Sequence, residues 1–152
     1  SRPQLGWVSR HRTHLAAWFQ ISIGIAIICW WIIAAATNGI VELEEGRIDI
    51  VFHIVAELLM AALLIIAGVS LRRRGQTRST NVVSGLALGT LLYSSINSPG
   101  YFAEQGAWWA LGMFAAIVAA TVFVAMNLMK ADQRPRARGE TTAVATEYGR
   151  TP

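Results

Sequence analysis

Residues 50–71 read IVFHIVAELLMAALLIIAGVSL, an apolar run in which Glu57 is the only Asp, Glu, Lys or Arg. A helix of about 20 apolar residues is long enough to cross the hydrocarbon core of a bilayer. The run therefore predicts a transmembrane helix. A carboxyl group inside such a helix is costly unless it has a partner, so Glu57 marks the first candidate for a functional position.

Three further runs, residues 13–41, 79–103 and 105–129, contain no Asp, Glu, Lys or Arg. The chain of 152 residues is 54% hydrophobic and 14% charged, with a mean hydropathy of +0.44, which leaves little material for a soluble domain. Strands of a membrane barrel are excluded, because they show about ten residues of alternation, whereas these runs are apolar on every face.

We therefore predict an all-α integral membrane protein, in which four transmembrane helices form an up-down-up-down bundle within residues 1–131. The helices are expected at about residues 15–37, 50–71, 80–98 and 106–129. Residues 132–152 are polar and basic and have no apolar period, so we expect a C-terminal tail that is disordered by itself.

Charged residues separate into two sets along the chain. The basic set is Arg2, Arg10 and Arg12, then Arg72, Arg73, Arg74 and Arg78, and finally Lys130, Arg134, Arg136, Arg138 and Arg150. The segments after the first and third apolar runs carry the acids Glu42, Glu44, Glu45, Asp49 and Glu104, with Arg47 as their one basic residue. Because cytoplasmic segments collect Lys and Arg, both termini are predicted to be cytoplasmic.

This sidedness also bears on partners and location. It accounts for the net charge of +4, so a nucleic-acid partner is not expected. Membrane lipid is the expected partner of the apolar helices. Arginine supplies 12 of the 13 basic residues, and with abundant Ala and Gly this is typical of a GC-rich bacterial genome. We expect a multi-pass protein of the bacterial inner (plasma) membrane. The residues before the first apolar run lack a signal-peptide pattern, so that run is expected to direct insertion itself.

The hairpin of the second and third helices predicts a polar cluster. If its turn is centred near Gly75, residue n lies level with residue 150 minus n, which sets Glu57 level with Tyr93 and His53 level with Asn97. His53 and Glu57 are spaced i, i+4 on the second helix, and Tyr93 and Asn97 are spaced i, i+4 on the third. The two residues of each helix therefore lie on one face of it. A cluster of His53, Glu57, Tyr93 and Asn97 is predicted, about 12 Å below the outer surface when counted from the start of the helix.

Small residues are expected to allow close approach of helices. Ala61 would lie level with Gly89, and Gly85 with Gly89 forms a GxxxG element, which permits close backbone contact in a membrane. On the fourth helix, a second set is expected to pack against a neighbouring subunit. Its members are Gly112, Ala116 and Ala120.

The polar cluster has three interpretations at this point. It could pin two helices together, form part of a proton or ion pathway, or bind a quinone or another small ligand. A metal site is not expected, because His53 is the only intramembrane histidine and a stable transition-metal site normally needs three or four ligands. With Cys29 as the single cysteine, thiol–disulfide chemistry within the chain is not expected either.

Two local features complete the expectations for the apolar runs. Trp30 and Trp31 are interpreted as interfacial anchors near the outer end of the first helix, where indole rings prefer to lie. The third helix is expected to stop at residue 98, since Pro99 disfavours a helical conformation of the residue before it and Pro-Gly favours a turn.

Part of the chain resembles a known family. The segment from Ala56-Glu57-Leu58 through Ile66-Ala67-Gly68-Val69 to Leu71-Arg72-Arg73, followed by residues 86–92, resembles the second and third helices of the DoxX-like family of small four-helix bacterial membrane proteins. The resemblance implies a redox environment for Glu57, because members of that family are linked to quinone-coupled sulfur oxidation and to membrane oxidoreductase complexes. His53, residues 97–101 and the basic tail lie outside the resemblance.

Two functions follow as expectations. The first is a non-catalytic accessory or structural subunit of a larger bacterial membrane complex, most plausibly of the respiratory electron-transfer chain, which contacts other subunits through its fourth helix and C-terminal tail. The second is a DoxX-like redox protein that binds quinone as its cofactor at the His53, Glu57 and Tyr93 cluster. A small oligomeric transporter or channel is a third. An enzyme is the less favoured class, because no established catalytic signature is present.

Overall fold

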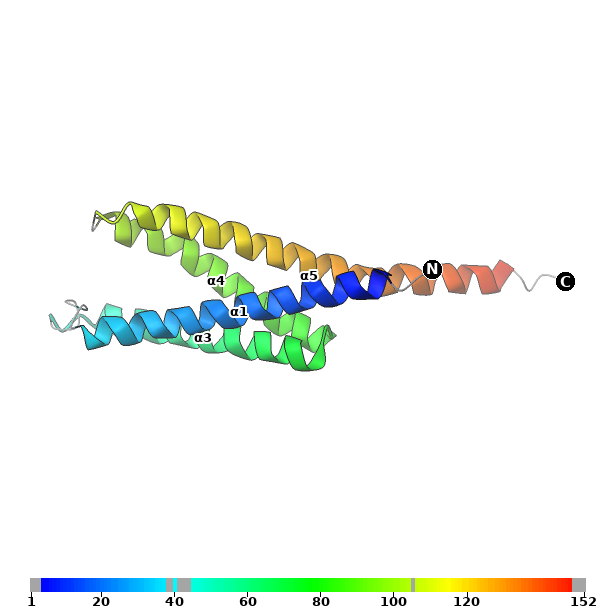
Figure 1. The fold of residues 1–152 in the computed structure, drawn as a ribbon, viewed down its shortest axis with the longest axis horizontal. Coiled ribbons are helices and arrows are strands. Elements are labelled where there is room, and N and C mark those ends of the chain that lie inside the picture. The colour runs from blue at the N-terminus through cyan, green and yellow to red at the C-terminus, as the bar shows by residue number, and fades with distance from the viewer. Residues whose placement is uncertain (1–3, 38–39, 41–44, 105, 149–152) are drawn as a thin grey trace.

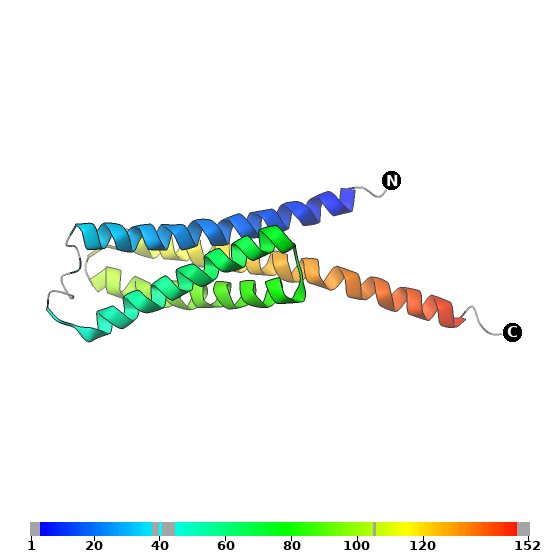
Figure 2. The same ribbon diagram turned by 90° about the horizontal axis from the view of Figure 1, so that it is seen from below.

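The computed structural model describes residues 4–37, 40, 45–104 and 106–148, and the side chains of those between 10 and 130. Four helices make up this part of the chain (Figure 1): α1 Gln4–Ala36, α3 Ile48–Arg74, α4 Arg78–Glu104 and α5 Trp109–Tyr148. The helices lie side by side, and the chain reverses direction between each helix and the next (Figures 1 and 2). The start of α1, the end of α5 and the α3–α4 turn therefore lie toward one end of the molecule.

The helices pack mainly as two antiparallel pairs. α1 lies along α3, and α4 lies along α5. α4 runs diagonally, so that it meets α3 at the turn and diverges from it toward the opposite end, where α5 is its neighbour (Figure 1).

Two glycines set the close approach of α1 to α3. A Cβ atom added to Gly24 would lie 2.7 Å from the Ala61 carbonyl oxygen, and one added to Gly68 would lie 2.6 Å from the Ala17 carbonyl oxygen. In both pairs the residue numbers add to 85, and successive members on each helix are seven residues apart. Small residues at this spacing let the two backbones touch without a side chain between them.

The buried core occupies the half of the molecule nearer the α3–α4 turn and its middle. One cluster joins residues of all four helices and consists of Ala16, Ala17, Leu71, Leu88, Val124 and Leu128. The other, in the middle, consists of Met60, Leu64, Ala67, Ala87 and Leu91. Gln20 is fully buried between them, and its Nε2 donates to Ser84 Oγ on α4 at 3.4 Å, which ties α1 to α4.

Hydroxyl groups organise the α3–α4 turn. Gly75 has a φ of +66°, a left-handed conformation that glycine adopts without strain. The backbone N–H of Thr77 donates to Thr80 Oγ1 at 2.8 Å, and the N–H of Thr80 donates to Thr77 Oγ1 at 3.2 Å. This reciprocal pair satisfies donors at the start of α4, as a capping box does. Gln76 Nε2 donates to the Leu128 carbonyl at 3.1 Å, which fastens the turn to α5.

Aromatic rings connect the two helix pairs at the opposite end. Phe102 of α4 lies edge-on to Trp30 of α1, with ring centroids 6.4 Å apart, and 5.6 Å from Phe114 of α5. Tyr101 stands beside Phe102 at 5.6 Å. These contacts close that end where few side chains are buried.

Three helical segments in the described residues are long and apolar enough to cross a membrane: Arg10–Ala36, Ile48–Arg74 and Trp109–Lys130. α4 is 27 residues long, the same length as α3. It does not reach the same hydropathy, because serine, threonine and asparagine replace apolar residues along it.

Three boundaries differ clearly from the predicted ones. α1 begins at Gln4, 11 residues before the expected start at about residue 15. α4 continues through Pro99 to Glu104 and does not stop at residue 98. Pro99 leaves the Ser95 carbonyl without its helical N–H donor, and the Ser98 hydroxyl donates to the neighbouring Ser94 carbonyl at 2.8 Å. α5 continues to Tyr148, so most of the segment expected to be a disordered tail is helical.

We predict that Gly68→Ala lowers the free energy of unfolding by about 1–3 kcal/mol, because the new methyl group meets the Ala17 backbone and forces the helices apart. The measurement is unfolding of the detergent-solubilised protein followed by circular dichroism. Gly89→Ala is the matched control, since nothing lies within 4 Å of an added Cβ there. Equal stability of the two variants would contradict the close α1–α3 contact.

Candidate functional site

Three side chains from α1 and α3 meet around the intramembrane carboxyl group. Trp31 Nε1 donates to Glu57 Oε2 at 2.7 Å. His53 Nε2 lies 3.3 Å from Glu57 Oε1, one helical turn before it on α3. The Trp31 and His53 rings stand edge to face, with centroids 6.2 Å apart and an interplanar angle of 75°. We call Trp31, His53 and Glu57 the carboxylate cluster.

The helix contact described above places this cluster. Continuing the α1–α3 register seven residues beyond Gly24 brings Trp31 level with Ile54, between His53 and Glu57. Trp31 thus reaches the gap between two residues spaced i, i+4 on the facing helix. The close backbone approach at Gly24 is what brings the indole within hydrogen-bonding distance.

Each carboxyl oxygen of Glu57 has one nitrogen close to it, Trp31 Nε1 beside Oε2 and His53 Nε2 beside Oε1. The indole N–H can only donate, and the His53 Nε2–H can donate in the neutral ring with that tautomer or in the imidazolium.

The two α3 side chains of the cluster differ in exposure. The Glu57 side chain is 18% exposed, whereas that of His53 is 52% exposed. The carboxyl group is therefore enclosed by the two helices, and the imidazole faces outward from α3.

Tyr93 and Asn97 lie elsewhere. Tyr93 is 73% exposed and Asn97 is exposed, both on the outer side of α4. The level pairing of Glu57 with Tyr93 and of His53 with Asn97 differs from the structure, because α4 turns away from α3 toward α5.

Of the residues predicted to pack helices together, one is fully buried and most are exposed. Ala61 is fully buried, and its close partner is Gly24 of α1 where Gly89 of α4 had been expected. Gly85 and Gly89 are exposed, with nothing within 4 Å of an added Cβ. On α5, Gly112 and Ala116 are exposed as well, and Ala120 is half-buried.

The chemistry open to the carboxylate cluster is that of one acid and one imidazole. Within the described residues, no group of three or more His, Cys, Asp or Glu side chains converges as a metal site would require. The pair can hold or exchange a proton, or offer a donor and an acceptor to a polar ligand from the membrane side.

Comparison with protein families places the chain. Residues 10–140 match the family described as Domain of unknown function (DUF8058). The chain belongs to this family. Searches of curated proteins and of solved structures find no match. The DUF8058 match extends from the first turns of α1 into the last part of α5, so it includes the carboxylate cluster and the outer face of α4.

Trp31 is the member of the cluster that the sequence analysis assigned to another role, as an interfacial anchor. A usable signal was present, since Ala17, Gly24 and Trp31 are spaced by seven residues, as are Gly68 and Ala61. Pairing Ala17 with Gly68 and Gly24 with Ala61 in an antiparallel arrangement aligns α1 with α3 and places the Trp31 indole beside Glu57.

We predict energetic coupling between Trp31 and Glu57. A double-mutant cycle of Trp31→Phe and Glu57→Leu should give about 0.6–1.7 kcal/mol in detergent unfolding, the range for hydrogen bonds between membrane helices. Trp30→Phe is the matched control, because Trp30 packs on Phe102 and should show no coupling to Glu57. A cycle energy near zero for Trp31 would mean that the hydrogen bond contributes nothing.

Proposed function

We propose that this chain is a non-catalytic subunit of a larger membrane assembly, with four transmembrane helices and both termini in the cytoplasm. We place that assembly in a bacterial inner membrane. The observation that carries the proposal is an outer face of α4 whose small and polar residues have no partner within the described chain.

The fourth membrane crossing rests on length and connection. α4 has 27 residues and is about 40 Å long at 1.5 Å per residue, enough for the full thickness of a bilayer. It connects the end of α3 to the start of α5, and both of these helices run toward the chain termini (Figure 2). If α3 and α5 cross in the same direction, α4 has to return the chain across the membrane between them.

The orientation rests on charge. The ends of α1 and α3 at the terminal side carry Arg10, Arg12 and the three arginines 72–74, whereas Asp49 and Glu104 lie at the opposite side. Under the positive-inside rule, the arginine-rich side faces the cytoplasm.

Labelling of single cysteines tests this topology in a Cys29→Ala background. We expect Glu45→Cys and Glu104→Cys to react with a membrane-impermeant maleimide on intact cells, and Arg74→Cys and Arg78→Cys to react only after permeabilisation. All four positions are exposed. Labelling of residues 78 and 104 from the same side would show that α4 does not cross the membrane.

The outer face of α4 supports assembly. Gly85, Gly89, Tyr93 and Asn97 follow one another at i, i+4, and all four are exposed. A glycine pair at this spacing lets a second helix approach closely, and an amide and a phenol beside it supply hydrogen bonds that are costly to leave unmade in lipid. We call these four residues the α4 face.

Two other exposed features, on α5 and α3, also favour contact with a neighbouring subunit. Gly112 and Ala116 expose a second small-residue surface on α5. His53 presents an imidazole on α3 within the membrane span. Polar side chains inside a membrane normally face protein or a water-filled cavity, so an exposed imidazole at this depth favours a neighbouring subunit.

Quinone binding is the second candidate function. The carboxylate cluster supports it, because His53 and Glu57 place a donor and an acceptor side by side at a half-exposed position. The resemblance of residues 56–73 and 86–92 to DoxX-like proteins favours a place in the respiratory electron-transfer chain for either candidate.

We predict that Gly89→Leu separates the chain from its assembly without destabilising the chain itself. A Cβ atom added at Gly89 has nothing within 4 Å in the described chain, and the leucine side chain blocks close approach of a second helix. The measurement is the size of the solubilised complex on native gels, together with the melting temperature. Ala26→Leu adds the same bulk at an exposed position of α1 and should leave the complex intact.

Glu57→Gln tests the quinone candidate alongside Gly89→Leu. If the complex survives Gly89→Leu, while Glu57→Gln abolishes retention of quinone by the purified protein, the assembly proposal is wrong and the quinone candidate replaces it.

A further inference from the structure

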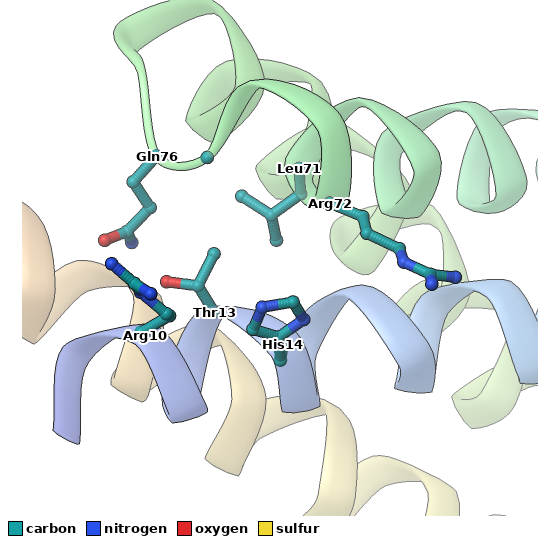
Figure 3. Close-up of a pocket in the computed structure, with 7 residues that line it drawn as sticks. Arg10, Thr13, His14, Leu71, Arg72 and Gln76 are labelled. Atoms are coloured by element: carbon teal, nitrogen blue, oxygen red, sulfur yellow. The ribbon is translucent and has the colours of Figure 1, made fainter. Parts of the chain in front are cut away.

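A basic cavity lies between α1 and α3 at the arginine-rich end of the molecule. Its volume is about 460 Å³. α1 contributes the first set of lining residues and α3 with the following turn contributes the second (Figure 3): Arg10, Thr13 and His14, then Leu71, Arg72, Gly75 and Gln76.

The lining carries positive charge without a counter-charge. Arg10 and Arg72 are permanently charged, and His14 adds an imidazole from the turn of α1 that follows Arg10. No acidic side chain of the described part of the chain lines the cavity. Thr13 and Gln76 add a hydroxyl and an amide to the same wall. Such a set of donors suits an anion that accepts several hydrogen bonds.

Arg72 lies on the far side of the cavity from Arg10 (Figure 3). Its guanidinium lies over the Trp18 ring, 4.6 Å from the centroid. Because Arg72 is exposed, its side chain can change rotamer and turn from Trp18 toward the cavity. In Figure 3, Arg10 extends toward Gln76, and His14 lies below Leu71.

The C-terminal end of α3 works against an anion, but only weakly. A helix C-terminus is equivalent to about half a negative charge, confined to its last turn. That turn contains Arg72, Arg73 and Arg74, and the α1 wall adds Arg10. The positive charge therefore exceeds the helix dipole several-fold.

The cavity also lies at a defined depth. Arg10 begins the first candidate membrane span, and Arg72 lies two residues before the end of the second, at Arg74. Both mark the level at which an apolar span gives way to water, which is where phospholipid phosphates lie. Leu71 supplies an apolar floor on the membrane side.

We propose that this cavity binds a phosphate group, held by the guanidinium group of Arg10 and by that of Arg72 after it turns from Trp18, with His14 as a further donor. Arginine suits phosphate because its planar fork donates two parallel hydrogen bonds. The phosphate belongs to an anionic phospholipid headgroup or to a free phosphate ion. The site is separate from the α4 face, so the assembly proposal can fail without affecting it.

The test compares two charge-matched double variants of the full chain. Arg10→Gln with Arg72→Gln removes the cavity arginines, and Arg73→Gln with Arg74→Gln removes two exposed arginines that do not line it. The proteins are purified in mixed micelles of phosphatidylglycerol and phosphatidylcholine, and retained lipid is measured by native mass spectrometry. We expect the cavity variant alone to lose phosphatidylglycerol by about tenfold or more, the effect of about 1.4 kcal/mol.

A second arm identifies the source of the phosphate. If inorganic phosphate raises the melting temperature of the wild-type chain and not that of the cavity variant, while neither lipid is preferred, the ligand is the free ion. Arg10→Lys with Arg72→Lys keeps both positive charges and should retain less phosphatidylglycerol than the wild type, because an ammonium cannot donate as a fork. Equal loss in both glutamine variants, or loss in neither, would overturn the proposal.

Discussion

The close contact of α1 with α3 is the constraint on which the rest of the structure depends. At Gly24 and Gly68 an added Cβ would lie within 2.7 Å of the facing backbone, so glycine is required at two points along one seam. Lipid tails are as apolar as the helices, and association therefore depends on packing and on interhelical hydrogen bonds. This seam provides both, because it leads directly to the bond from Trp31 to Glu57.

The seam also decides where α4 goes. The small face of α3, with Ala61 and Gly68, is occupied by α1, so it is not available along its whole length to the next helix in sequence. α4 packs against α3 from the turn to the middle of the molecule, where Leu91 belongs to the same cluster as Met60, and then follows α5 (Figure 1). As a result, the glycines of α4 face outward.

Local features of the structure could be predicted from the sequence, and the pairing of helices could not. Apolar runs between charged segments indicated all four helices, and the i, i+4 spacing indicated that His53 and Glu57 share a face. The choice of partner for α3 depended on comparing two sets of small residues, one on each neighbour. The GxxxG element of α4 was the more familiar pattern, whereas the seven-residue spacing on α1 proved to be the one in close contact.

The two ends of the molecule are built for different surroundings. Toward the acidic end, His53 lies five residues into α3 and Asn97 seven residues before the end of α4, so both outward polar groups lie within about 11 Å of that end. Few side chains are buried there, and the carboxylate cluster and an aromatic contact replace a packed core. The basic end has the buried core, the capped turn and the arginines. The α1–α3 seam joins these ends, since the same register that closes the core at Ala17 and Gly68 places Trp31 against Glu57.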